Sequence, residues 1–178
     1  MSGHSKWSQI KHKKALVDAK KGKIFSKLAR AISVAARGDP DPTTNLRLKA
    51  EVDRAHAFNM PSDNIERAIK RVGDRDADTL ERVEVDVIGP AGVGIIVEAL
   101  TDNTNRTINE IKQVLSRRSA RMAGQGSLTW MFRRTDAGLE VAVPVPLPDP
   151  AQQSQLEALM DALDELDDVQ DVHTNADY

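Results

Sequence analysis

The sequence contains no cysteine and few aromatic residues. Among its 178 residues, Phe, Trp and Tyr together make up 3%. The lack of thiols excludes disulfides and thiolate metal sites. A core with so few rings has to be built from Leu, Ile, Val, Ala and Met, and the hydrophobic fraction of 40% is ordinary for a globular chain. The length allows one good core or two modest lobes.

Long apolar runs are also missing, and no hydrophobic stretch reaches the length needed to cross a bilayer. The first thirty residues are basic and poor in acids, as in an organelle transit peptide. They are rich in Lys rather than Arg, however, and they carry aromatic and Gly positions. We interpret them as part of the mature protein, and we expect a cytoplasmic protein with no membrane partner.

A formal net charge of −2 conceals a strong asymmetry between the two halves of the chain. Residues 1–75 contain 17 Lys or Arg and 8 Asp or Glu, a net charge of +9, whereas residues 76–178 contain 8 and 19, a net charge of −11. The basic half can neutralise phosphates and release their counterions, and the acidic half would be repelled by them. The charge pattern therefore indicates two functional halves.

Helical periodicity dominates the basic half, where apolar residues recur every three or four positions. Asp63, followed three residues later by Glu66, has the spacing of a capping box at the start of the last helix. The polar segment 74–80 is typical of a linker, so we predict a basic helical domain at residues 1–75. The expected helices cover residues 8–21, 24–35, 45–58 and 63–72.

In the acidic half the apolar period shortens to two, which is typical of half-buried strands. The expected order is ββαββαβ, an α+β fold whose mostly antiparallel sheet carries helices on one face. We predict this acidic domain at residues 81–178. Trp130 alternates with Leu128 and Phe132, so we expect it on a strand and mainly in the core. The expected strands are 83–87, 93–100, 128–132, 139–143 and 169–174, and the expected helices are 105–118 and 151–166.

Several long motifs occur along the chain. In the basic half they are SGHSKWSQIKHKKA at residues 2–15, DAKKGK at 18–23, FSKL at 25–28, and NMP with DNIERAIKR between 59 and 71. In the acidic half they are LTDN with NRT between 100 and 107, GS with WMF between 126 and 132, and DDVQ at 167–170. In these motifs and their order, the chain resembles the YebC/PmpR family.

The resemblance implies a helical N-terminal domain followed by two α/β lobes, one of them inserted within the other. Members of the family are usually described as transcriptional regulatory proteins that bind DNA. Their mitochondrial relatives look like translational activators, and bacterial members have been tied to the ribosome and to the synthesis of proline-rich stretches.

The chain departs from the family pattern at three places. Family members carry an extra lobe where this chain is shortened, at about residues 142–150, so we expect the inserted third lobe to be absent. Ser119 and Ala120 stand where the family tends to have paired glycines. His173 stands where a Tyr is common.

The basic half supplies the candidate nucleic-acid-binding residues. Because Asp18 is the only acid in the first thirty residues, phosphate binding is favoured over an ordinary solvated helix face. Lys contacts phosphate as a point charge, so the composition predicts recognition of backbone or shape more than of base edges. The candidates in this segment are His4, Ser5, Lys6, Trp7, Lys11, His12, Lys13, Lys14, Lys20, Lys21, Lys23, Lys27 and Arg30.

Two groups of candidates have an alternative interpretation. Trp7 can stack on a base or anchor the N-terminus on the helical domain, and its spacing does not separate these roles. Arg67 and Arg71 share a helix face with Lys70 close by, and all three are candidates for the same nucleic-acid surface. Equally, they are ordinary surface charges paired with Asp63 or Glu66.

Signals for catalysis are weak, and we expect no enzyme activity, no cofactor and no bound metal. His4, His12, His56 and His173 lack metal-ligand spacing. The glycines between 89 and 94 lie between two strands rather than before a helix, which indicates a hairpin turn instead of a phosphate loop. The carboxylates between 164 and 168 are typical of a solvated polar face.

The sequence therefore predicts a monomeric nucleic-acid-binding regulator of gene expression. One hypothesis is a transcriptional regulator that binds DNA. The alternative is a ribosome-associated translation factor that contacts ribosomal or transfer RNA and aids the synthesis of proline-rich stretches. The absence of a helix-turn-helix signal and the Lys-rich cluster favour the alternative, whereas the usual description of the family favours DNA.

Overall fold

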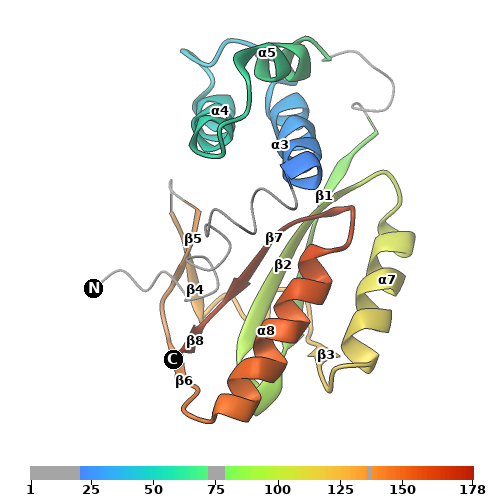
Figure 1. Cartoon of the computed structure of the whole chain (residues 1–178), viewed down its shortest axis with the longest axis vertical. Helices are drawn as coiled ribbons and strands as arrows, with labels where there is room; N and C mark the ends of the chain where they lie inside the picture. Colours follow the sequence, from blue (N-terminus) through green and yellow to red (C-terminus); the bar gives the residue numbers. More distant parts are fainter. Residues whose placement is uncertain (1–20, 72–78, 136–137) are drawn as a thin grey trace. The chain divides into compact units, whose positions relative to one another are not determined.

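The computed structural model describes residues 21–71, 79–135 and 138–178. They form two units: one comprises the described residues up to Glu81 together with Leu100–Asp102, and the other comprises Arg82–Ala99 and Asn103–Tyr178. The first unit is helical, and the second combines a sheet with two helices (Figure 1). No helix among these residues is both long and apolar enough to cross a membrane. The helix expected at residues 8–21 lies outside the described residues, except for its last position.

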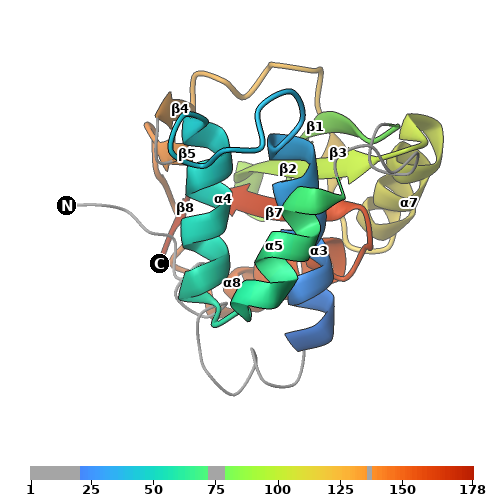
Figure 2. The same cartoon turned by 90° about the horizontal axis from the view of Figure 1, so that it is seen from above.

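The helical unit consists of α3 (Lys21–Ala35), α4 (Leu46–Ala57) and α5 (Ser62–Lys70). Helix α3 packs against both of the others (Figure 2). The apolar positions that recur along each helix meet in one core, as helical periodicity predicts. The largest buried side chains of this core are Leu28, Ile32, Leu48, Phe58, Met60 and Ile65.

Short polar turns fix the angles between these helices. Asn45 caps α4 by accepting a hydrogen bond from the Leu48 N–H, and its amide donates to the carbonyls of Ala35 and Asp39 at 2.8 and 2.7 Å. Asn59 adopts a φ of +57° after α4, a left-handed conformation that Asn tolerates better than most residues. This turn directs Met60 into the core, where it is 4% exposed.

The predicted capping box of α5 is wrong. The helix begins one residue earlier than expected, at Ser62, and Pro61 occupies the cap position without any side-chain cap hydrogen bond. Asp63 therefore lies inside the first turn. There its charge interacts favourably with the N-terminal end of the helix dipole.

The α/β unit is built on a four-stranded sheet in the order β3-β1-β2-β7 (Figure 1). Helices α7 (Thr104–Ser116) and α8 (Pro150–Asp164) contribute Ile111, Leu115, Leu156 and Leu163 to a core with the sheet residues Val87, Ile95 and Val97. The prediction of an α+β fold is confirmed. The strands of this sheet are β1 (Glu81–Ile88), β2 (Gly94–Thr101), β3 (Arg121–Met122) and β7 (Val169–Thr174).

A second apolar cluster covers the side of β2 that points away from this core. Ile96 packs there with Leu128, Met131 and Phe132. The hairpin of β4 (Phe132–Thr135) and β5 (Gly138–Val141) continues this layer, and β6 (Val145–Pro146) pairs in parallel with β8 (Ala176–Asp177). Only these short elements lie between β5 and α8, so the expected absence of an inserted lobe is confirmed.

The strand predicted at 128–132 is wrong over most of its length. Residues 125–131 form turns, and the strand β4 starts only at Phe132. Leu128, Met131 and Phe132 are buried, but Trp130 is 61% exposed. A helical turn in the segment, marked by the Met131 N–H donating to the Leu128 carbonyl, breaks the alternation that would have placed Trp130 inside.

Candidate nucleic-acid interface

A groove between α3 and α5, with a volume of about 530 Å³, brings together three of the candidate residues. Arg30 comes from α3, and Arg67 comes from α5 with Arg71 directly after its end. The other lining residues are Phe25, Ser26, Ala29, Ser33, Met60, Asn64, Ala68 and Leu80. We refer to this feature as the α3–α5 groove.

The floor of the groove is apolar and firmly held. Met60, Ala68 and Ser33 are each no more than 4% exposed. The Ser33 hydroxyl donates to the Ala68 carbonyl at 2.8 Å, which satisfies a polar group on the apolar face of α3 and joins the two helices. These side chains are fixed by the packing of the two helices, whereas Arg67 and Arg71 are exposed.

The described lining of the groove is rich in positive charge. Among the described residues that line it, none is Asp or Glu. Arg67 donates to the Asp63 carbonyl at 3.2 Å and to the Asn64 side-chain oxygen at 2.7 Å. The Arg71 side chain makes no hydrogen bond or ion pair with any residue that the structure describes. An anion entering the groove would therefore meet the guanidinium groups of Arg67 and Arg71, which no described carboxylate neutralises.

The alternative of ordinary surface pairing holds for one of the three candidates on this part of the chain. Lys70 lies 3.6 Å from Glu66, and both side chains are well exposed. Such an exposed pair contributes little to stability. Arg67 and Arg71, in contrast, form no ion pair with Asp63 or Glu66 within the described residues.

The remaining candidates on α3 extend the basic character of the helix. Lys21 places its Nζ atom 5.6 Å from the centroid of the Phe25 ring, so it adds a positive charge beside the groove. Lys23 and Lys27 are half-buried on the same helix. The other candidates lie outside the described residues: His4, Ser5, Lys6, Trp7, Lys11, His12, Lys13, Lys14 and Lys20.

Sequence reasoning missed the apolar and amide part of the groove. In the sequence, Phe25 stands out only within the motif FSKL at residues 25–28, and Met60 only within the motif NMP. The one available signal was Ser33, a polar residue between Ile32 and Val34 on a face otherwise destined for the core. A buried hydroxyl needs a partner, and here that partner is the backbone of α5.

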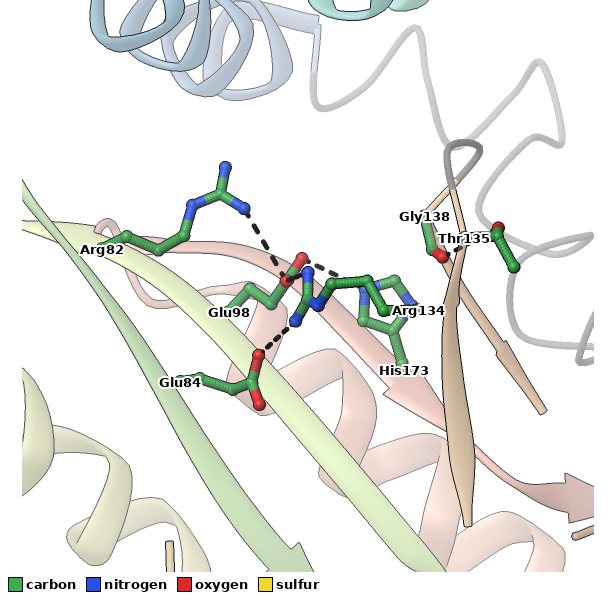
Figure 3. Close-up of polar contacts among 7 residues, drawn as sticks. All are labelled: Arg82, Glu84, Glu98, Arg134, Thr135, Gly138 and His173. Atoms are coloured by element: carbon green, nitrogen blue, oxygen red, sulfur yellow. Dashed lines mark hydrogen bonds and ion pairs between the residues drawn. The ribbon is translucent and has the colours of Figure 1, made fainter. Parts of the chain in front are cut away.

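Several basic residues in the α/β unit have carboxylate partners instead. In Figure 3, Arg82, Arg134 and His173 converge on Glu98, whose side chain is only 15% exposed. Arg134 also lies 2.5 Å from Glu84, which links β4 to the sheet. The His173 ring lies 3.4 Å from Glu98. This cluster neutralises its own charges and offers little to a phosphate.

The pairing determines the protonation of Glu98. Burial alone would raise the pKa of this carboxyl. The hydrogen bond and the charge of His173, together with Arg82, outweigh burial and lower the pKa from its ordinary value of 4.5. Glu98 is therefore held in its charged form, as a counterion within the sheet.

The motifs of the acidic half also serve the structure. Asn103 caps α7 by accepting a hydrogen bond from the Arg106 N–H. The Arg106 guanidinium and the Thr107 hydroxyl both donate to Asp168, at 2.8 and 2.7 Å. Asp168 is 6% exposed, so it is not part of the solvated acidic face that the sequence predicted. It joins the start of α7 to the start of β7.

Comparisons with known proteins agree with this architecture. The family model of the TACO1/YebC protein N-terminal domain matches residues 5–75, and that of the TACO1/YebC second and third domain matches residues 80–137. A solved structure, a conserved hypothetical protein of Aquifex aeolicus, is similar with a TM-score of 0.83 and 30% identity. The alignment covers 97% of each chain.

Curated relatives are similar over large parts of the sequence. A probable transcriptional regulatory protein of Caldanaerobacter subterraneus is 54% identical over 134 residues, which is 74% of this chain and 55% of that protein. Another of the same description, from Chlorobaculum tepidum, is 44% identical over 170 residues, or 94% and 66% of the two chains. The chain spans about half the length of the first of these relatives and two thirds of the second. Because the family models match most of its residues in both units, the chain belongs to the TACO1/YebC family.

Proposed function

We propose that this chain regulates gene expression by binding nucleic acid through the α3–α5 groove and the basic residues beside it. The observation that carries the proposal is the meeting of Arg30, Arg67 and Arg71 in a groove whose described lining contains no carboxylate. Phosphates are the anions that such a set of guanidinium groups binds with charge-assisted hydrogen bonds.

DNA is the target class that the relatives favour, since their printed descriptions are those of probable transcriptional regulatory proteins. These descriptions name regulators rather than enzymes. We therefore propose a non-catalytic, cytoplasmic role in transcription. Backbone contacts of this kind give affinity and salt dependence but little direct sequence readout.

Fluorescence anisotropy with a labelled DNA duplex tests the proposal. We expect binding that weakens with salt, and a large loss of affinity in the double variant Arg67→Glu/Arg71→Glu. The matched control is Arg117→Glu/Arg118→Glu, which reverses the same number of exposed charges in the α/β unit. The control should bind like the wild type.

Two results would contradict the proposal. One is an absence of binding to every nucleic acid tested at moderate salt. The other is an equal loss in both double variants, because that would show a response to net charge rather than to the groove.

A further inference from the structure

We infer that the α3–α5 groove receives an unstacked nucleotide, so that its ligand is a single-stranded segment of nucleic acid rather than an intact duplex. This inference rests on the proposed function and specifies the chemistry of its ligand. It starts from the lining of the groove, which combines three arginines with half-buried apolar side chains.

A duplex exposes phosphates, sugars and the edges of stacked bases. A flat basic face would be enough to hold its backbone. The α3–α5 groove also presents carbon surface from Phe25, Ala29 and Leu80, which are half-buried. A base that has left its stack offers a flat apolar face that can cover this surface.

The dimensions and polar groups also suit one nucleotide. A volume of about 530 Å³ falls within the range of sites for small molecules, about 300 to 1,000 Å³. Phe25 is half-buried at the wall, so part of its ring stays available for contact with a base. Asn64 supplies an amide that can pair with a base edge, although its oxygen already accepts from Arg67.

The cations are arranged around this apolar part. Arg67 and Arg71 are four residues apart and therefore lie on the same side of the α5 axis, while Arg30 faces them from α3. Lys21 adds its charge over the ring of Phe25. A base against the floor would thus have cations close to the phosphates on either side of it.

The test compares oligonucleotides of one sequence as single-stranded DNA, single-stranded RNA and duplex DNA, each labelled and titrated by anisotropy. We expect both single strands to bind more tightly than the duplex, and the two single-strand arms show whether DNA or RNA is preferred. Phe25→Leu keeps apolar volume but removes the ring. It should weaken single-strand binding by about 5- to 150-fold, as expected for loss of one stacked base, and weaken duplex binding by a smaller factor. Phe25→Trp should restore single-strand binding.

Photocrosslinking locates the contact independently of affinity. A single strand carrying 5-iodouracil is irradiated with the wild-type protein, and the tryptic peptides are identified by mass spectrometry. We expect crosslinks on residues 24–27 or 55–67, the peptides that contain Phe25 and Met60. Crosslinks found only elsewhere would overturn the inference.

Failure of the inference differs from failure of the proposed function. If the duplex binds as tightly as the single strands and Phe25→Leu changes none of the affinities, the groove holds backbone only, and nucleic-acid binding still stands. If no oligonucleotide binds at all, both are wrong.

Discussion

Neutralising the two arginines of α5 should change how nucleic-acid binding depends on salt, and the size of the change follows from the structure. Arg67→Gln/Arg71→Gln removes two guanidinium groups that form no ion pair with a described carboxylate of the groove. Each phosphate contact contributes about 0.7 to the slope of log K against log salt for a single strand, and about 0.9 for a duplex. Loss of two contacts should therefore make the slope shallower by about 1.4 to 1.8.

Such a difference is large enough to measure. Between 50 and 200 mM salt the wild type should lose roughly 7- to 12-fold more affinity than the variant. Anisotropy titrations at four salt concentrations give the slope. Both side chains are exposed, so the variant should unfold within about 0.5 kcal/mol of the wild type. The reasoning is refuted if the two lines are parallel, because the arginines would then act on affinity without neutralising a phosphate.

Three further predictions concern the α/β unit. Asp168→Ala should lower the free energy of unfolding in urea by about 2 to 3 kcal/mol, since it leaves the buried Thr107 hydroxyl and the half-exposed Arg106 without this acceptor. A loss below about 1 kcal/mol would contradict the role of Asp168 in connecting α7 to β7. The carboxyl of Glu98 should titrate by NMR below pH 4.5, and the stability that it contributes, present above that pH, should fall as the pH drops through its folded pKa. His173→Gln should raise that pKa, and an unchanged midpoint would count against the pairing. Ser119→Gly should stabilise the protein by up to about 1 kcal/mol, measured as a higher Tm. Ser119 has a left-handed φ of +52°, and the steric cost of this conformation for a non-glycine residue exceeds the extra chain entropy that glycine loses on folding. A lower Tm would show that this backbone is unstrained.

Local patterns were sufficient to predict most of the elements. The apolar residues of α3 and α4 recur with the helical period, and apolar and acidic residues alternate along β1 from Val83 to Val87. The two failures have local causes as well. Pro61 takes the cap position that Asp63 was expected to fill, and turns replace the strand around Trp130. Hydrophobic periodicity could not reveal either difference, because both depend on the residue at which a helix or strand starts.

The groove could not be predicted in the same way. Phe25 and Arg67 are 42 positions apart, and α4 lies between them in sequence. The sequence predicted that Arg67 and Arg71 share a face, but the residues opposite that face are determined by the packing of α3 against α5. The apolar lining of the groove could not be predicted from the sequence either, because an apolar residue beside a groove has the same periodicity as an apolar residue in a core.

The net charge of a unit is therefore a poor guide to where a phosphate binds. The group that each cationic side chain contacts in the fold is a better guide. Arg134 in the acidic unit lies between two carboxylates, and Arg106 in that unit donates to Asp168. Removing either arginine would weaken the fold and would reveal nothing about a ligand. Arg67 is satisfied by a carbonyl and an amide oxygen, which leave its positive charge uncompensated. A side chain held in place by neutral acceptors stays oriented and still attracts an anion, so substitutions at Arg67 separate binding from stability in a way that substitutions at Arg134 do not.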